Sequence, residues 1–306
     1  MSFAHEVKKE LSKAVHTNQS TELSECYGML LFSRHFSASE TALKTESIHV
    51  AEKYTDLLTK LFSPVIEKQS TLRASKKFIN LHAVNLVIPE ESANIFSYFG
   101  HSDKSPSLRL NRANIDDDMC RAAFLRGAFM SCGSVNDPEK NYHLEFCSQY
   151  KNLSNDLCTL LEEIEECRLT PKVVLRSGAY VVYLKDSEQI TDLLTYIGAP
   201  NSAMDIMNAK AYKEMRNIAN RRTNSELANI AKTASASARQ LAAIEKLDNT
   251  IGLSSLPAQL YEIALLRQQN PELSLRDLGE MLSPPISRSG VNHRLMKLVE
   301  LAEEEL

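Results

Sequence analysis

The chain has 306 residues, with 35 lysines and arginines against 39 aspartates and glutamates, and 43% of its residues are hydrophobic. This composition is typical of a globular protein of two or three domains and excludes disordered and fibrous chains. No stretch approaches the roughly 18 consecutive apolar residues that a membrane-spanning helix needs, and the N-terminus lacks the apolar core of a signal peptide. We therefore expect a cytosolic protein without a membrane partner.

The six cysteines give no sign of a metal or redox site. No two of them have the Cys-x-x-Cys spacing, and Cys158 and Cys167 lack histidines at the spacing of zinc ligands. We expect six reduced thiols that serve mainly in packing, with no metal and no cofactor.

The net charge of −4 hides a local basic segment. Between residues 210 and 239, seven lysines and arginines stand against two glutamates, while four glutamates lie in the C-terminal tail. A phosphate backbone responds to such local clustering and not to the charge of the whole chain. A nucleic-acid partner is therefore compatible with the acidic total.

Helical and strand patterns alternate up to about residue 200, and only helical patterns follow. The first part predicts helices at 22–32, 48–62, 89–99, 116–130, 153–167 and 186–197, and strands at 78–88, 142–147, 173–175 and 180–184. Gly178 supplies the turn of the last hairpin, because glycine accepts a positive φ. The change of pattern predicts an α+β protein with a domain boundary near residue 199.

The first part also contains a candidate internal repeat. Gly28 and Gly127 each lie in an apolar helix, 99 residues apart, and similar elements follow each of them in the same order. Glycines at these positions would allow the two helix backbones to approach closely. Coincidence is the alternative, because glycines in apolar helices are common.

The segment 121–138 resembles one of the two paired helices of a single-chain LAGLIDADG homing endonuclease. Together with the segment 273–298, it makes the chain similar to the WhiA family of bacterial sporulation and cell-division regulators. The resemblance covers essentially the whole chain, although residues 36–110 match only in pattern. It implies an N-terminal duplicated LAGLIDADG-like α/β domain at 1–199 (repeats at about 1–110 and 111–199), a linker or helix at 200–222, and an all-helical helix-turn-helix domain at 223–306.

The resemblance also indicates where a nuclease would hold its metal ions. An active enzyme of this type places one carboxylate at the end of each paired helix, because the two carboxylates together bind the divalent ions. Alignment on the glycines puts Ser33 and Cys132 at these positions, and neither is a hard carboxylate ligand. Arg34 follows the first position and adds a positive charge. The resemblance therefore implies degenerate catalytic positions and a protein that is not an enzyme.

The C-terminal part predicts four helices. Thr223-Asn224-Ser225-Glu226 is a capping box, which predicts a helix start at Thr223, and the helical pattern continues to Gly252. Further helices are predicted at 257–269, from Ser274, and at 288–303, with two prolines breaking the chain before the last one. Two short helices joined by such a break are typical of a helix-turn-helix.

Two groups of side chains are candidates for DNA contact. Lys232, Arg239 and Lys246 recur every seven residues on one helix stripe, which would contact phosphates, although a solvated face is the alternative. On the last helix, short polar side chains point away from the buried direction of Val291, between flanking arginines that would contact phosphates. The candidate DNA-binding residues are Arg221, Arg222, Lys232, Arg239, Ser287, Arg288, Ser289, Asn292, His293 and Arg294.

These features predict a sequence-specific transcriptional regulator that binds double-stranded DNA in the cytoplasm and associates with the nucleoid. The family resemblance extends the role to cell division, chromosome segregation or sporulation. One alternative is a nucleoid-associated or division scaffold protein that binds DNA without selecting promoters. Another is an active metal-dependent DNA endonuclease. Because residues 111–209 are net acidic, a regulatory or division protein is a further candidate partner for the nuclease-like domain.

Overall fold

The computed structural model describes residues 2–74, 78–105 and 107–304. The chain divides into two compact units, Met1–Lys213 and Glu214–Leu306, which we call the N-terminal and C-terminal units. None of the helices in the described ranges combines the length and apolarity needed to cross a bilayer.

The N-terminal unit repeats one order of elements. A first helix, α1 (Phe3–Leu11), precedes both repeats. The first repeat consists of α2 (Gln19–Leu31), β1 (His35–Phe36), β2 (Thr41–Thr45), α3 (Ile48–Phe62), β3 (Ile66–Ala74), β4 (Phe78–Leu86) and α4 (Pro89–Tyr98). The second consists of α5 (Asp118–Cys132), β5 (Gly133–Val135), β6 (Leu144–Ser148), α6 (Lys151–Glu162), β7 (Lys172–Arg176), β8 (Ala179–Leu184) and α7 (Ser187–Tyr196). A short 3-10 helix, η1 (Arg112–Asn114), lies between them.

The two sheets have the same topology. Their strand orders are β1-β2-β4-β3 and β5-β6-β8-β7, and all neighbouring strands are antiparallel. Each sheet therefore places the same elements at its centre and at its edges. This equivalence confirms the internal duplication that the glycine spacing predicted.

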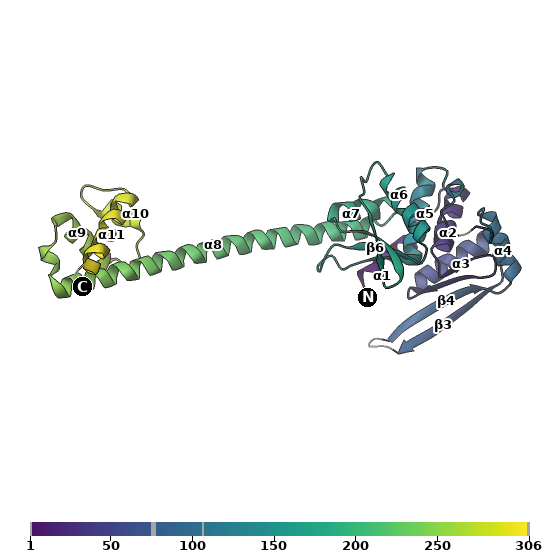
Figure 1. Ribbon diagram of the computed structural model, residues 1–306, viewed down its shortest axis with the longest axis horizontal. Coiled ribbons are helices and arrows are strands. Elements are labelled where there is room, and N and C mark those ends of the chain that lie inside the picture. Colours follow the sequence, from purple (N-terminus) through teal and green to yellow (C-terminus); the bar gives the residue numbers. More distant parts are fainter. Residues whose placement is uncertain (1, 75–77, 106, 305–306) are drawn as a thin grey trace. The chain divides into compact units, whose positions relative to one another are not determined.

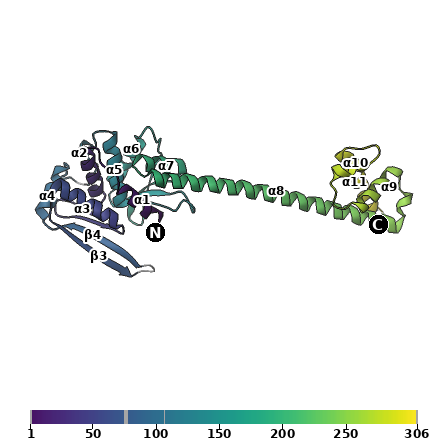
Figure 2. The ribbon, with the colours of Figure 1, turned by 180° about the vertical axis from the view of Figure 1, so that it is seen from behind.

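Helices α2 and α5 lie side by side at the centre of the N-terminal unit (Figures 1 and 2). A Cβ atom added at Gly28 would lie 2.1 Å from the carbonyl oxygen of Phe124, and one at Gly127 would lie 2.1 Å from the carbonyl oxygen of Glu25. Both distances are far inside van der Waals contact, so only glycine fits at either position. The predicted close approach of the two helix backbones is confirmed.

A buried ion cluster joins the two repeats beside these glycines. Glu25 of α2 is fully buried, and Arg126 of α5 donates a hydrogen bond to it through Nε. The Nζ of Lys53 lies 3.5 Å from Oε1 of Glu25, which supplies a second cation. Burial lowers the pKa of nearby His16 to about 4, so that its ring is neutral at pH 7 and its 3.6 Å approach to Glu25 is not an ion pair.

The C-terminal unit is helical. It contains the C-terminal part of α8 (Pro200–Thr250), the 3-10 helix η2 (Leu253–Ser255), α9 (Ala258–Gln269), α10 (Leu275–Met281) and α11 (Arg288–Glu304). Its core is formed by apolar residues of all four α-helices, including Ile244, Ile263, Leu278 and Leu295. Ser274 caps α10 in a capping box with Asp277, as the sequence predicted.

The predicted helix start at Thr223 is wrong. Thr223 lies inside α8, which continues without interruption through 51 residues. The sequence contains no proline or glycine from residue 201 to residue 251, so nothing breaks the helix, and a capping side chain has no free amide to bind. Glu226 instead accepts a 2.9 Å hydrogen bond from Nε of Arg222.

Candidate nucleic-acid interface

A basic cavity of about 500 Å³ lies on the C-terminal unit, between α8, α9, α10 and α11. Its basic lining residues are Lys232, Arg267, Arg276 and Arg288, and Asn292 lines it beside them. No aspartate or glutamate is among the described residues that line it. Arg276 pairs with Glu280 across one helical turn, with 3.0 Å between Nε and Oε1. Three predicted DNA-contact residues, on two different helices, therefore share one positively charged depression.

Helix α11 has a buried face and an exposed polar face. Val291, Leu295 and Leu298 are buried in the core, which fixes the rotation of the helix about its axis. Arg288, Ser289, Asn292 and His293 are exposed, and Arg294 is half-buried. Within the described ranges, none of these five side chains has a hydrogen bond or ion pair to another group. Their hydrogen-bonding capacity is therefore available to an external partner.

Ser287 has a local structural role. Its hydroxyl oxygen accepts a 3.3 Å hydrogen bond from the backbone amide of Gly290, in the first turn of α11. The residue therefore holds the start of the helix that presents Arg288 and Asn292. Its predicted contact with DNA stays a prediction.

The predicted basic stripe on α8 divides into two parts. Lys232 lines the cavity, whereas Arg239 pairs with Glu303, with 2.7 Å between Nη2 and Oε1, and Lys246 donates a 2.6 Å hydrogen bond to the carbonyl oxygen of Ala302. The last two side chains therefore bind the C-terminal end of α11, where positive charge is favourable. Arg221 and Arg222 are exposed.

The buried face of α8 also begins later than its apolar pattern suggests. Leu227 and Ile230 are 58% and 65% exposed, although both lie at helical spacing from the apolar residues further along α8. The first buried residues of this helix within the C-terminal unit are Ser237 and Gln240. Lys232 is therefore on an exposed turn of the helix, just before the turn that packs on the other helices.

Arg267 is a site residue that the sequence analysis missed. It is 2% exposed, and its Nη1 donates to the carbonyl oxygens of Leu273 at 2.8 Å and Pro271 at 3.4 Å. Burial lowers the pKa of its guanidinium, and its Nε has no partner among the described residues. A signal was present in the sequence, because helical spacing puts position 267 on the same face as the buried Ile263 and Ala264. A buried arginine without a carboxylate adds positive charge to the wall of the cavity.

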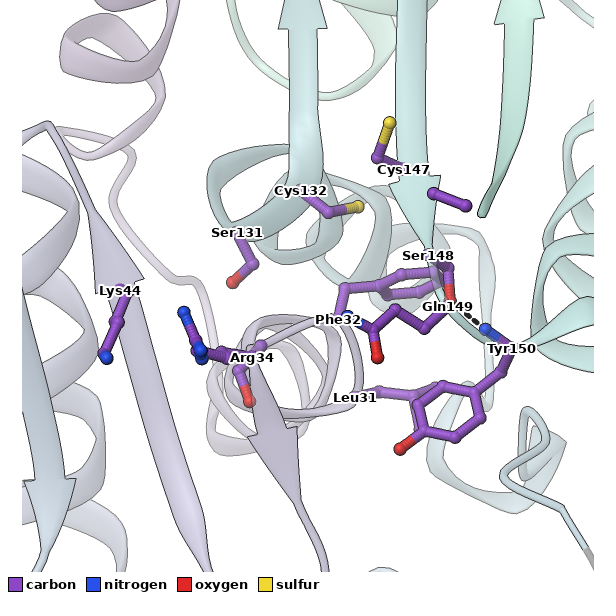
Figure 3. Close-up of a pocket in the computed structure, with 12 residues that line it drawn as sticks. Leu31, Phe32, Arg34, Lys44, Ser131, Cys132, Cys147, Ser148, Gln149 and Tyr150 are labelled. Carbon is purple, nitrogen blue, oxygen red and sulfur yellow. Dashed lines mark hydrogen bonds between the residues drawn. The ribbon is translucent and has the colours of Figure 1, made fainter. Parts of the chain in front are cut away.

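In the N-terminal unit, Ser33, Arg34 and Cys132 line one cavity of about 370 Å³. Figure 3 shows Arg34 and Cys132 at this cavity. The Ser33 hydroxyl lies 2.7 Å from the carbonyl oxygen of Leu30 and 3.0 Å from that of His35, so its proton is already shared between carbonyls. Burial raises the pKa of Cys132 to about 12, which keeps it a neutral thiol at pH 7.

These residues do not fit a pair of divalent ions. No aspartate or glutamate lines the cavity in the described part of the chain, and Arg34 contributes a positive charge. Hard cations such as Mg²⁺ require oxygen ligands, mostly from carboxylates. Throughout residues 2–74, 78–105 and 107–304, no three His, Cys, Asp or Glu side chains are grouped to hold a metal.

Comparison with known proteins identifies the family. The family model described as "WhiA C-terminal HTH domain" matches residues 219–302, and the one described as "WhiA LAGLIDADG-like domain" matches residues 121–216. The "Probable cell division protein WhiA" of Clostridium botulinum (strain Hall) is 37% identical over 324 residues, which cover 99% of this chain and 98% of the relative. The chain belongs to the WhiA family.

Further relatives agree with this assignment. The WhiA protein of Alkaliphilus metalliredigens (strain QYMF), also named a probable cell division protein, is 39% identical over 266 residues, 85% of this chain and 83% of its own. The crystal structure of full-length WhiA from Thermatoga maritima has a TM-score of 0.60 at 23% identity and covers 99% of both chains, which supports the same fold. The predicted combination of a LAGLIDADG-like domain with a WhiA helix-turn-helix domain is confirmed.

The two WhiA matches place the candidate residues in their domains. The helix-turn-helix match spans every predicted DNA-contact residue, from Arg221 to Arg294, and also Arg267. The LAGLIDADG-like match includes Cys132 but begins after Ser33. The equivalence of Ser33 and Cys132 therefore rests on the duplicated topology and on their shared cavity.

Proposed function

We propose that this WhiA family member is a sequence-specific transcriptional regulator that binds double-stranded DNA through its C-terminal unit. The observation that carries the proposal is the convergence of Lys232, Arg288 and Asn292 on one cavity. Among the described residues, no acidic side chain lines this cavity, and the exposed polar side chains of α11 beside it have no partner. Two kinds of side chain are needed for sequence reading, cations for phosphates and short polar groups for bases. This surface offers both.

The relatives that are named probable cell division proteins support a role in cell division for this chain as well. We propose that the regulated genes serve cell division, chromosome segregation or sporulation. The protein would then act in the cytoplasm, on the nucleoid.

The contacts divide by chemistry. Arg288 and Lys232 contact phosphates, because both line the cavity and have no carboxylate partner within the described ranges. Asn292 reads a base, because its amide has both a donor and an acceptor and projects from the N-terminal half of α11. Ser289 and His293 flank it on the same exposed face.

Replacing Asn292 with alanine should relax the sequence preference at one or two positions of the site. A good bidentate base contact contributes about 1–3 kcal/mol of discrimination, whereas it contributes little to binding of random DNA. Arg288→Ala is the matched control, since loss of a phosphate contact should weaken specific and random binding alike. The measurement is a competition titration against duplexes that carry single-base changes. Full wild-type preference of Asn292→Ala at every position would exclude Asn292 as a base reader.

Replacing Lys232 with alanine should weaken binding to all duplexes and lower the salt slope of log K by about 0.9, the value for one lost phosphate contact. Arg239→Ala should change both the slope and the affinity less, because Arg239 pairs with Glu303 and does not line the cavity, and an exposed ion pair is worth about 0–1 kcal/mol. Lys140→Ala, which removes an exposed charge in the N-terminal unit, controls for net charge. An unchanged slope in Lys232→Ala would show that this lysine is only solvated.

We also propose that the nuclease activity of the LAGLIDADG fold has been lost, which Ser33, Arg34 and Cys132 support. Purified protein with Mg²⁺ or Mn²⁺ should leave duplex DNA intact over a long incubation, as followed on a gel. Site-specific, metal-dependent cutting by the unmodified chain would overturn this part of the proposal and would support an active endonuclease.

A further inference from the structure

The cavity at the ends of α2 and α5 belongs to the N-terminal unit, whereas the proposed DNA-binding residues belong to the C-terminal unit. Figure 3 shows Arg34 and Lys44 on one side of it and Ser148, Gln149 and Tyr150 on the opposite side. The two cations come from the first repeat, whereas Ser148 ends β6 in the second repeat and Gln149 and Tyr150 follow it directly. Its volume, about 370 Å³, is within the range of small-molecule pockets.

The two cations have no carboxylate partner in the described part of the chain. Arg34 donates through Nε to Nε2 of His35 at 3.2 Å, which leaves its Nη groups available, and Lys44 has no hydrogen bond or ion pair to a described residue. A neighbouring cavity shares Lys44 and adds Lys8, and Glu46 is the one acidic residue among its described lining residues. Unpaired cations that face one depression repel each other, and a bound anion removes this repulsion.

The opposite wall supplies neutral donors. The Ser148 oxygen accepts a 3.1 Å hydrogen bond from the amide of Tyr150, so its own hydrogen remains available to a ligand. The side-chain amide of Gln149 is exposed and has no partner among the described residues. By contrast, the Ser131 hydroxyl already donates to the carbonyl oxygen of Met29 at 2.8 Å.

The guanidinium and the ammonium on one side of the cavity match the acceptor oxygens of a phosphate group, and the hydroxyl and the amide on the opposite side match polar atoms of the rest of a ligand. Tyr150 also lines the cavity, and it is 43% exposed, so its ring offers a flat apolar surface beside these donors. An aromatic ring next to a phosphate site favours a ligand that has a planar ring of its own.

We propose that this cavity binds a small phosphorylated molecule with a planar ring, of the nucleoside monophosphate class. Arg34 and Lys44 hold the phosphate on one side of the cavity, Ser148 and Gln149 donate to polar atoms of the nucleoside on the opposite side, and the Tyr150 ring contacts the planar group. The site lies wholly within the N-terminal unit and does not depend on the proposed DNA-binding surface.

The test is isothermal titration of the full chain with adenosine and guanosine 5′-monophosphate, with inorganic phosphate, and with a short DNA duplex at one salt concentration. The double variant Arg34→Gln/Lys44→Gln should bind the monophosphate at least about tenfold more weakly, since it loses two charge-assisted hydrogen bonds. Tyr150→Ala should weaken binding of the nucleoside monophosphate but not of inorganic phosphate. Lys140→Gln, which lies outside the cavity, should leave both affinities unchanged.

Folding of each variant is checked by thermal melting, and Ser148→Ala, expected to bind several-fold more weakly, replaces the double variant if that one does not fold. Three results would overturn the proposal. The first is the absence of monophosphate binding at millimolar concentration. The second is monophosphate binding that is unchanged in Arg34→Gln/Lys44→Gln or in its replacement. The third is that these variants bind the duplex more weakly but bind the monophosphate as the unmodified chain does. The third result would assign the two cations to phosphates of the DNA backbone.

Discussion

Replacing Gly127 with alanine is expected to destabilise the N-terminal unit by about 3 kcal/mol. The new Cβ would lie 2.1 Å from the carbonyl oxygen of Glu25 and 2.9 Å from the amide nitrogen of Met29. Both atoms belong to the backbone of α2, so no side chain can rotate away and the two helices must separate. Alanine gains about 1 kcal/mol in helix propensity over glycine, which is too little to offset the loss of packing.

Urea unfolding of the full chain, followed by a probe in the N-terminal unit, measures this effect. Gly28→Ala should give a similar loss, because its Cβ would meet the carbonyl oxygen of Phe124 at the same distance. Gly178→Ala is the matched control. A Cβ added at Gly178 would meet no atom within 4 Å, and only the positive φ of 82° is unfavourable for alanine. The variant should therefore lose about 1–2 kcal/mol of unfolding free energy. An unchanged or raised midpoint for Gly127→Ala would contradict the close packing of α2 on α5.

Replacing Glu25 with glutamine is expected to lower the free energy of unfolding by about 3–5 kcal/mol, the usual effect of removing one partner of a buried ion pair. The change leaves the guanidinium of Arg126 and the ammonium of Lys53 without their shared carboxylate. The second hydrogen bond of Arg126, from Nη1 to the carbonyl oxygen of Ile197 at 3.2 Å, cannot neutralise the charge. His16 does not compensate either, because its ring is neutral at pH 7.

Denaturant unfolding at pH 7 again provides the measurement. Arg112→Gln is the control, since its pair with Glu163 is exposed on both sides and should contribute no more than about 1 kcal/mol. If Glu25→Gln lowers the free energy of unfolding no more than Arg112→Gln does, then the buried cluster does not hold the two repeats together.

The parts of the fold that were predictable from the sequence are those that local chemistry determines. The 99-residue spacing of Gly28 and Gly127 predicted the helix contact, because only glycine permits it. Ser274 and the prolines at 284 and 285 predicted where α10 begins and where the chain breaks before α11. Each of these signals acts within a few residues or through a missing side chain.

The features that were missed depend on tertiary context. Strand β3 carries several charged and polar residues because it is the edge strand of its sheet, so its pattern does not resemble a buried strand. The capping box at Thr223 failed because a capping side chain stabilises a helix start only where the backbone leaves the helix. Arg267 escaped notice because surface arginines are far more common than buried ones.

For the candidate DNA-contact residues, the sequence predicted which face of α11 is exposed but not how the side chains of α8 and α11 are arranged together. Helical spacing identified the exposed face of α11, since Val291 determines which side is buried. The ion pair of Arg239 with Glu303 depends on how α8 packs against the end of α11, and no local pattern indicates it. The same packing determines that Lys232, and not Arg239, lines the cavity beside Arg288.

The most direct test of sequence-specific DNA binding is a selection from random duplexes with the full chain, followed by a competition measurement. The enriched duplex and a scrambled duplex of equal length are compared at one salt concentration, about 150 mM. Our account predicts that the chain enriches a defined site and binds it at least about 10³-fold more tightly than the scrambled duplex. Equal affinity for the two duplexes would contradict it and would support a protein that binds DNA as a scaffold without selecting promoters.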